Sequence, residues 1–257
     1  MSIHIKNINK KFGSFDVLKG ANLEVKAGEL TALLGPSGSG KTTLLRIIAG
    51  LEFADSGEVL LDGEDANDTH VKDRRVGFVF QHYALFKNMT VFDNVAFPLR
   101  EHTQLNESMV RDIVLMKLEA VGLRGASALM PAQLSGGMAR RVALARTIAL
   151  DPELIMYDEP FTGQDPISLG VLVRLIKRLN ELLHTTTIIV SHDVEETCSI
   201  ADYIYLISGG KIIGQGSPEA LMQSSEPQVK QFMHGEADGV VPFHYPARSY
   251  TEELLDA

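Results

Sequence analysis

Cysteine is almost absent from this 257-residue chain, because Cys198 is the only one. A single cysteine cannot form a disulfide within the chain, and it cannot supply a four-cysteine metal site. Such a composition suits a reducing compartment. The sequence therefore favours a cytosolic location.

Long hydrophobic runs are missing as well. No apolar run reaches the roughly 18 residues that a membrane-spanning helix needs, and the longest candidates, at 30–34 and 188–190, have the length of strands. The first residues, Met1 to Lys6, lack the apolar core and small-residue cleavage site of a secretory signal. The sequence thus predicts a chain that neither crosses a membrane nor carries an export signal.

Basic residues are outnumbered, since 24 Lys and Arg stand against 33 Asp and Glu and the formal net charge is −9. Nucleic acids are normally bound by a basic face, so this balance argues against a nucleic-acid partner. The hydrophobic share of 45% and the charged share of 22% are those of a globular protein, which excludes a disordered or fibrous chain. We expect one domain with a subdomain.

Short alternating stretches separated by glycines occupy 3–25 and predict an antiparallel sheet. The apolar run 30–34 leads into a glycine-dense stretch and then into helical spacing over 42–50, which predicts a strand–loop–helix unit. Further strands are expected at 58–61 and 76–80.

From about Asn88 to Leu150, apolar residues recur at helical spacing, which predicts a mostly helical region. Later strands at 154–157 and 187–190 flank a helix near 168–183, the alternation of a parallel sheet. From Pro227 the mixture of polar, proline and aromatic residues predicts an extended tail.

The predicted fold class is α/β, with a parallel core sheet, an antiparallel β subdomain and a helical subdomain over about 88–150. We expect the main domain to cover 1–235 and the extended tail to cover 236–257.

A phosphate-binding loop is the most specific motif. The stretch Gly35-Pro36-Ser37-Gly38-Ser39-Gly40-Lys41-Thr42 has two glycines at the required spacing before Lys and Thr, between a predicted strand and helix. Its glycines let backbone N–H groups form an anion nest, Lys41 can reach the β and γ phosphates, and the Thr42 hydroxyl can ligate Mg²⁺. The motif predicts a nucleoside triphosphate and leaves GTPases, kinases and motor ATPases open.

Two adjacent carboxylates, Asp158 and Glu159, end the apolar strand that starts at Leu154. After a phosphate loop we expect Asp158 to hold Mg²⁺ and Glu159 to act as general base or orienter for the attacking water. An Asp-Glu pair without that loop is usually a solvated strand end.

A second small-residue turn, Ser135-Gly136-Gly137, precedes a predicted helix and suits an anion at the helix N-terminus. An ordinary Ser N-cap with glycines for a tight turn is the plainer interpretation. Because the chain has one phosphate loop, a second such element makes sense if it serves a nucleotide bound to another copy.

These motifs, with Gln81 and His192, follow the order found in the ATPase subunits of ABC transporters, which the chain resembles over nearly its whole length. The resemblance implies an ABC-type P-loop NTPase that uses ATP and Mg²⁺ as a head-to-tail homodimer. It assigns Gln81 to the loop that touches Mg²⁺ and water and reports to the permease. It makes His192 the switch histidine on the γ-phosphate.

Four more residues receive roles from the same resemblance. Asp165 matches the loop that crosses between two subunits, and Thr43 joins the phosphate-binding set. Phe12 is similar to the aromatic residue that stacks on adenine, and Phe15 competes with it for that role.

Within the family, the part from about residue 91 resembles the ATPases of Mla phospholipid-transport systems. Before that point the chain resembles sulfate and thiosulfate import ATPases, and we interpret it as a mosaic joined near Thr90–Asn94. The stretches that carry the first likeness are Val91–Leu105, Met116–Arg124, Leu134–Arg141, Gly163–Pro166, Ala237–Gly239, Val241–Phe243 and Tyr245–Pro246. Met138 stands where Gln is commoner in the family. The second likeness is carried by Leu33–Glu52 and Val76–Phe86.

The resemblance implies an ATPase that powers phospholipid transport between membranes, placed peripherally on the cytoplasmic side of the bacterial inner membrane. Its expected partners are a membrane permease, a second ATPase copy, a small cytosolic regulatory subunit and a membrane-anchored lipid-binding subunit, with the tail near Phe243 to Tyr250 holding the neighbouring copy or the regulator.

Three alternatives remain open: a sulfate importer ATPase, a soluble non-transport ABC ATPase and a phosphate-loop kinase. The length of 257 residues disfavours the first, because sulfate-type ATPases carry a further regulatory domain.

Overall fold

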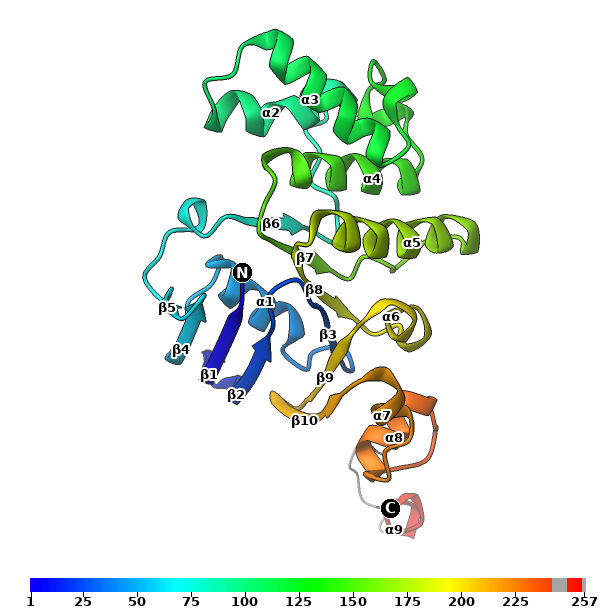
Figure 1. The fold of residues 1–257 in the computed structure, drawn as a ribbon. Coiled ribbons are helices and arrows are strands. Elements are labelled where there is room, and N and C mark those ends of the chain that lie inside the picture. The colour runs from blue at the N-terminus through cyan, green and yellow to red at the C-terminus, as the bar shows by residue number, and fades with distance from the viewer. Residues whose placement is uncertain (242–248, 256–257) are drawn as a thin grey trace.

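A six-stranded sheet forms the centre of the computed structural model, which describes residues 1–241 and 249–255 (Figure 1). Its strand order is β10-β9-β3-β8-β7-β6. The strands from β9 to β6 are parallel to one another, and β10 is antiparallel to β9. The strands are β3 (Leu30–Leu34), β6 (Val76–Val79), β7 (Leu154–Asp158), β8 (Thr186–Ser191), β9 (Tyr203–Ser208) and β10 (Lys211–Gly216).

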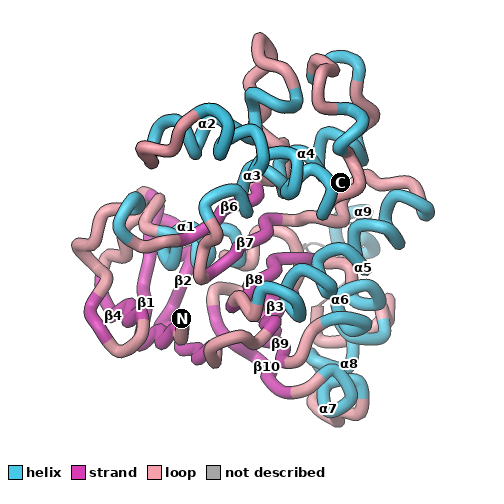
Figure 2. Tube along the Cα trace, turned by 45° about the horizontal axis from the view of Figure 1, so that its top comes forward, coloured by secondary structure: helices cyan, strands magenta, loops and turns pink. Residues whose placement is uncertain are grey.

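A second sheet, antiparallel throughout, has the order β2-β1-β4-β5. Figure 2 shows β4, β1 and β2 of this sheet side by side. Its strands are β1 (Ile3–Phe12), β2 (Phe15–Val25), β4 (Ser56–Leu61) and β5 (Glu64–Asp65). The β1 side chains of Ile3, Ile5 and Ile8 are buried in one cluster with the apolar face of α1 (Lys41–Ala49), and an irregularity in the strand between Ile5 and Ile8 keeps the third on the same face. The predicted antiparallel sheet is therefore confirmed, and it packs against the first helix.

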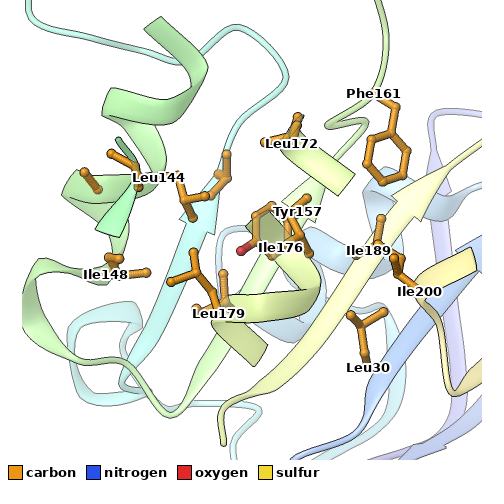
Figure 3. Close-up of a cluster of buried hydrophobic side chains, with 14 of the residues drawn as sticks. Leu30, Leu144, Ile148, Tyr157, Phe161, Leu172, Ile176, Leu179, Ile189 and Ile200 are labelled. Carbon is orange, nitrogen blue, oxygen red and sulfur yellow. The ribbon is translucent and has the colours of Figure 1, made fainter. Parts of the chain in front are cut away.

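The central strands are apolar on both faces because both faces are covered. In β7, Leu154 and Met156 pack with α1, whereas Ile155 and Tyr157 pack in the opposite cluster with α5 (Pro166–Leu183) (Figure 3). Continuous burial of this kind is typical of parallel strands covered by helices. The prediction of a parallel core sheet is thus confirmed.

A helical region stands at one end of the molecule (Figure 1). It consists of α2 (Val91–His102), α3 (Glu107–Ala120) and α4 (Gly136–Thr147), with short 3-10 turns η2 (Arg124–Ala126), η3 (Pro131–Gln133) and η4 (Ile148–Leu150). These elements fall within the expected helical subdomain of 88–150, and the division of the chain at those bounds stays a prediction. The α4 side chains Leu144 and Ala145 are buried in the same cluster as the α2 and α3 core.

The 3-10 turn η1 (Val71–Asp73) lies between β5 and β6. The remaining helices come after β8 in the chain. They are α6 (Val194–Ile200), α7 (Pro218–Met222), α8 (Pro227–His234) and α9 (Tyr250–Leu255). Within the described ranges, no helix is long and apolar enough to cross a membrane.

The expected extended tail from Pro227 is wrong for two segments. Residues 227–234 form α8, because Pro227 begins the helix and Val229 and Met233 are buried four residues apart on one face. Residues 250–255 form α9. The part of the expected tail that includes Phe243 and Tyr245 lies outside the described residues.

A buried arginine holds the far end of α1. The Arg74 guanidinium donates to the carbonyl oxygens of Ile47 at 3.1 Å and Ile48 at 2.7 Å, which end the helix. It also donates to the carbonyl oxygens of Ala66 and Thr69. Burial lowers the pKa of Arg74. The Ile47 carbonyl also accepts a hydrogen bond from the Gly50 N–H at 3.0 Å. One side chain therefore joins the last turn of α1 to the loop before η1.

Replacing this arginine tests how firmly α1 is held. Arg74→Met should lower the free energy of unfolding by about 3 kcal/mol, because four backbone carbonyls lose the guanidinium that donates to them. Arg75→Met is the matched control: Arg75 is exposed and paired with Glu153 at 2.9 Å, and its loss should cost no more than about 0.5 kcal/mol. Denaturant unfolding of both variants measures the difference, and equal losses would contradict the capping role.

Candidate functional site

The phosphate loop joins β3 to α1 in a path that only glycine can follow at two points. Gly35 has φ 151°, and a Cβ there would lie 2.0 Å from the carbonyl oxygen of Ile207. Gly40 has φ 101°, and a Cβ there would lie 2.7 Å from the carbonyl oxygen of Val17. The glycines of the motif therefore allow the loop to press against β9 and β2 while it turns into the helix.

The loop's lysine is turned onto its own backbone. Lys41 Nζ donates to the carbonyl oxygens of Gly35 at 2.8 Å and Pro36 at 3.0 Å, and it lies 3.9 Å from Glu159 Oε1. Burial lowers the pKa of Lys41, and the carboxylates of Glu159 and Asp158 act in the opposite direction. The buried Lys41 ammonium donates to two carbonyls, and its nearest carboxylate is 3.9 Å away. It is therefore suited to give up the carbonyl contacts and donate to a phosphate oxygen instead.

An unpaired hydroxyl lies in the same loop. Ser39 Oγ is buried and makes no hydrogen bond within the described part of the chain. Buried polar atoms without partners are rare in folded proteins and often mark a ligand position. Together with the inward-turning loop and Lys41, this hydroxyl indicates that the loop is built around an anion.

The two carboxylates at the end of β7 have different surroundings. Asp158 is buried, and its Oδ1 accepts a hydrogen bond from Thr42 Oγ1 at 2.8 Å. Glu159 has a left-handed backbone, φ 51°, and its N–H donates to the carbonyl of Val190 in β8 at 2.9 Å. The two adjacent acids thus contact different groups: Asp158 accepts from Thr42, whereas Glu159 lies 3.9 Å from Lys41 Nζ.

Glu159 faces the histidine predicted from sequence. His192 Nδ1 lies 2.8 Å from Glu159 Oε2, and Thr162 Oγ1 lies 3.4 Å from that same oxygen. His192 Nε2 is 3.7 Å from Asp193 Oδ1. Glu159, His192 and Asp193 each bring one ligand atom within 4.8 Å of the others, a set distinct from the expected metal ligands Thr42, Gln81 and Asp158. Sequence reasoning missed Thr162 and Asp193, because nothing in the spacing separates them from ordinary loop residues.

Most of these groups, though not Asp158 or Asp193, line one open cavity of about 560 Å³, a volume in the range of small-molecule sites. The structure brings Gln81, Glu159 and His192 into it together with the phosphate loop. Both candidate aromatic residues, Phe12 and Phe15, line it and are half or more exposed, at 51% and 64%. The lining residues are Phe12, Phe15, Val17, Ser37, Gly38, Ser39, Gly40, Lys41, Thr42, Thr43, Gln81, Glu159, Thr162 and His192.

The second anion element lies elsewhere. Of the described residues that line the cavity, none is Ser135, Gly136, Gly137 or Asp165. Ser135 Oγ accepts from the Met138 N–H at 3.2 Å as the N-cap of α4, and Asp165 caps α5 in the same manner. A Cβ on Gly137 would lie 2.9 Å from Ser168 Oγ, so the two helix starts are neighbours.

Buried Asn94 is a further residue that sequence reasoning missed. Its side chain accepts from the Phe86 N–H at 2.9 Å and donates to the carbonyls of Phe86, Met89 and Thr90. One amide therefore ties the segment after Gln81 to the first turn of α2. No local pattern announces this role, because its partners are backbone groups of an irregular loop.

Nucleotide binding to this cavity can be measured as a thermal shift. A nucleoside triphosphate at about 100 times its Kd should raise the melting temperature by about 5–10 °C, since it binds only the folded chain. Lys41→Met should abolish the shift.

Lys26→Met is the control for that experiment, since Lys26 is exposed in the turn before β3. It should keep the full shift. A Lys41→Met protein with an undiminished shift would contradict the assignment of the loop.

Comparison with known proteins agrees with this geometry. Residues 18–162 match the family described as ABC transporter. The chain is 57% identical to the intermembrane phospholipid transport system ATP-binding protein MlaF of Haemophilus influenzae, over 99% of this chain and 98% of that protein. It is 48% identical to the sulfate/thiosulfate import ATP-binding protein CysA of Ralstonia nicotianae, over 95% of this chain and 66% of that protein.

Solved structures show the same fold. The dimeric post-hydrolysis state of the ATP-binding cassette MJ0796, bound to ADP and Pi, superposes with a TM-score of 0.77 at 33% identity, covering 84% of this chain and 98% of that one. The predicted likenesses to both kinds of transporter ATPase are confirmed, whereas the join near Thr90–Asn94 stays a prediction. The chain belongs to the ABC transporter family, as one of its ATP-binding and ATP-hydrolysing subunits.

Proposed function

We propose that this chain hydrolyses ATP to power phospholipid transport between membranes, as the ATPase of an Mla-type system. The observation that carries the proposal is the pairing of Glu159 with His192 beside a phosphate loop. The end-to-end likeness to a phospholipid-transport ATPase supports the choice of cargo.

The phosphate loop would hold the β and γ phosphates of ATP. The backbone N–H groups of residues 37–42 supply the nest, Ser39 Oγ gains the partner it lacks, and Lys41 exchanges carbonyl contacts for phosphate oxygens. Phe12 or Phe15 would cover the adenine at the open side of the cavity.

The oxygen donors beside the loop fit Mg²⁺. Thr42 Oγ1 and Asp158 Oδ1 already lie 2.8 Å apart, and Gln81 lines the same cavity, which is the hard-oxygen donor set that Mg²⁺ prefers. When bound there, Mg²⁺ would neutralise charge that develops on the phosphates. Asp158 and Thr42 would hold it, and Gln81 would complete the set.

Glu159 would act as general base or orienter for the attacking water. Its carboxylate lies in the cavity between Lys41 and His192, so it can accept a proton from a water placed in line with the γ-phosphate. His192 would contact that phosphate while its Nδ1 fixes the carboxylate. The contribution of these side chains is positioning and electrostatic stabilisation.

The functional unit would be a head-to-tail dimer. Ser135, Gly136, Gly137 and Asp165 lie outside the cavity that the phosphate loop forms, yet α4 offers the N-terminus of a 12-residue helix to an anion. A second copy that presents these residues to the bound ATP would complete the site. ATP would then close the dimer because it contacts both copies, and hydrolysis would release it.

A permease would be the membrane partner, with Gln81 and the segment after it reporting the state of the nucleotide. The chain would act as a peripheral protein on the cytoplasmic side of the bacterial inner membrane, where ATP is available. A small cytosolic regulatory subunit and a membrane-anchored lipid-binding subunit would complete the complex. These assignments rest on the Mla likeness.

Glu159→Gln should retain ATP binding and lower the steady-state hydrolysis rate by about 100-fold or more, because the amide cannot accept the water's proton. ATP should also leave the variant as a stable dimer, detectable by size-exclusion chromatography. Glu153→Gln is the control, since the Glu153 carboxylate pairs with exposed Arg75. This variant should hydrolyse ATP at the parent rate. Turnover near the parent rate in Glu159→Gln would refute the general-base assignment.

Sulfate import is the second candidate, favoured by the 48% identity to a sulfate/thiosulfate import ATPase. Co-reconstitution in liposomes separates the two. An Mla-type permease with its lipid-binding subunit should stimulate ATP hydrolysis several-fold, and a sulfate permease should leave the rate unchanged. Stimulation by the sulfate permease alone would reverse the assignment.

A further inference from the structure

A buried arginine in the first turns of α4 connects three parts of the site that the chain keeps far apart in sequence. Arg140 is only 4% exposed. Within the described residues, no carboxylate lies within ion-pair distance of it. A buried charge without a counter-ion is expensive, and burial does lower the pKa of Arg140. The contacts of the Arg140 guanidinium explain why the free-energy cost of burying its charge is tolerated.

Its first contact is the loop that follows the catalytic carboxylate. The Arg140 guanidinium donates to the carbonyl oxygen of Pro160 and, at 2.9 Å, to that of Thr162. Between these two carbonyls, Phe161 is buried in the hydrophobic core. The backbone immediately after Glu159 is therefore held from both sides, by the core and by the guanidinium.

Its second contact is the loop after Gln81. The guanidinium carbon lies 4.8 Å from the centroid of the Tyr83 ring, a cation–π contact. Tyr83 and Ala84 both have left-handed backbones, with φ 54° and 47°, a conformation that side-chain-bearing residues adopt only when surroundings impose it. Arg146, farther along α4, donates to the carbonyl oxygens of both residues at 3.1 and 2.8 Å.

The third part is α4 itself. Arg140 stands three residues after Gly137, so any shift of the Ser135-Gly136-Gly137 turn carries the guanidinium with it. One planar group thus touches the backbone after Glu159 and the loop after Gln81 from the helix that would face the partner's nucleotide. Arginine suits this task because its fixed fork serves two carbonyls while its face stacks on a ring.

We propose that Arg140 is a positioning residue that keeps Glu159 and the Gln81 loop in catalytic register with α4. The proposal rests on the hydrolytic function proposed above. Movement of α4 on dimer closure is passed directly to the backbone beside the general base, and movement of the Gln81 loop by a permease is passed to the same backbone. Arg140 itself contacts neither nucleotide nor water.

Arg140→Met tests this with Arg141→Met as the matched control. Both variants lose one guanidinium from α4, but Arg141 donates to the carbonyl of Val121, away from the cavity. Arg140→Met should lower kcat at least about tenfold, because small displacements of a catalytic group are costly, while the ATP Kd and KM stay within about threefold. Arg141→Met should keep kcat within about twofold of the parent. Rates are expressed per nucleotide-binding site, so that misfolded protein does not count.

Conservative replacement and the permease supply the remaining readouts. Arg140→Lys retains a charge that can reach one carbonyl, so it should recover part of kcat, and it carries the test where Arg140→Met does not fold. In liposomes with the permease, Arg140→Met should lose stimulation of hydrolysis as well as basal rate. A kcat within about twofold of the parent in both variants, or a loss in ATP affinity that accounts for the whole effect, overturns the proposal.

Failure of the proposed function has a different signature. If the parent itself hydrolysed no ATP, or if Glu159→Gln turned over like the parent, the general-base assignment would fall whatever the Arg140 variants did. An active parent, an inactive Glu159→Gln and a fully active Arg140→Met would refute only the role of Arg140.

Discussion

Burial of α1 between two sheets is the constraint on which the rest of the site depends. Ile3, Ile5 and Ile8 cover one side of the helix and the inward side chains of β7 and β8 cover the other, so it cannot shift without opening the core. Arg74 holds its last carbonyls, and Gly35 and Gly40 let the entering loop touch β9 and β2. The N–H groups at its start therefore form a rigid anion nest before any ligand arrives.

The register of the parallel sheet places the reacting groups around that nest. Leu34 at the end of β3 pairs with Ser191, and Asp158 at the end of β7 pairs with Val190 in the strand between them. Strands that run the same way finish at one edge, so the phosphate loop, the two carboxylates and His192 meet there although they lie far apart in the sequence. The order of the parallel strands thus determines which side chains meet at the phosphate loop.

The site could be predicted from the sequence because its functional residues directly follow short buried strands. The loop at 35–42, the carboxylates after Met156 and the histidine after Val190 each follow a short buried run, and the structure brings them together as expected. The arginine contacts were not predictable, because Arg74 and Arg140 bind backbone carbonyls of irregular loops and no spacing encodes them. Helix α8 was missed because the polar and proline content around it outweighed two apolar positions.

Four cations at the site and at the far end of α1 share one property that bears on how the site can move. Lys41, Arg74, Arg140 and Arg146 donate to backbone carbonyls, and burial lowers the pKa of each. A carbonyl can be released and regained without separating two full charges, so such contacts can rearrange at lower cost than buried ion pairs. They also leave Asp158 and Glu159 free for cation and water. An acidic chain can therefore hold a phosphate site whose cation contacts can rearrange while α1 stays fixed in the core.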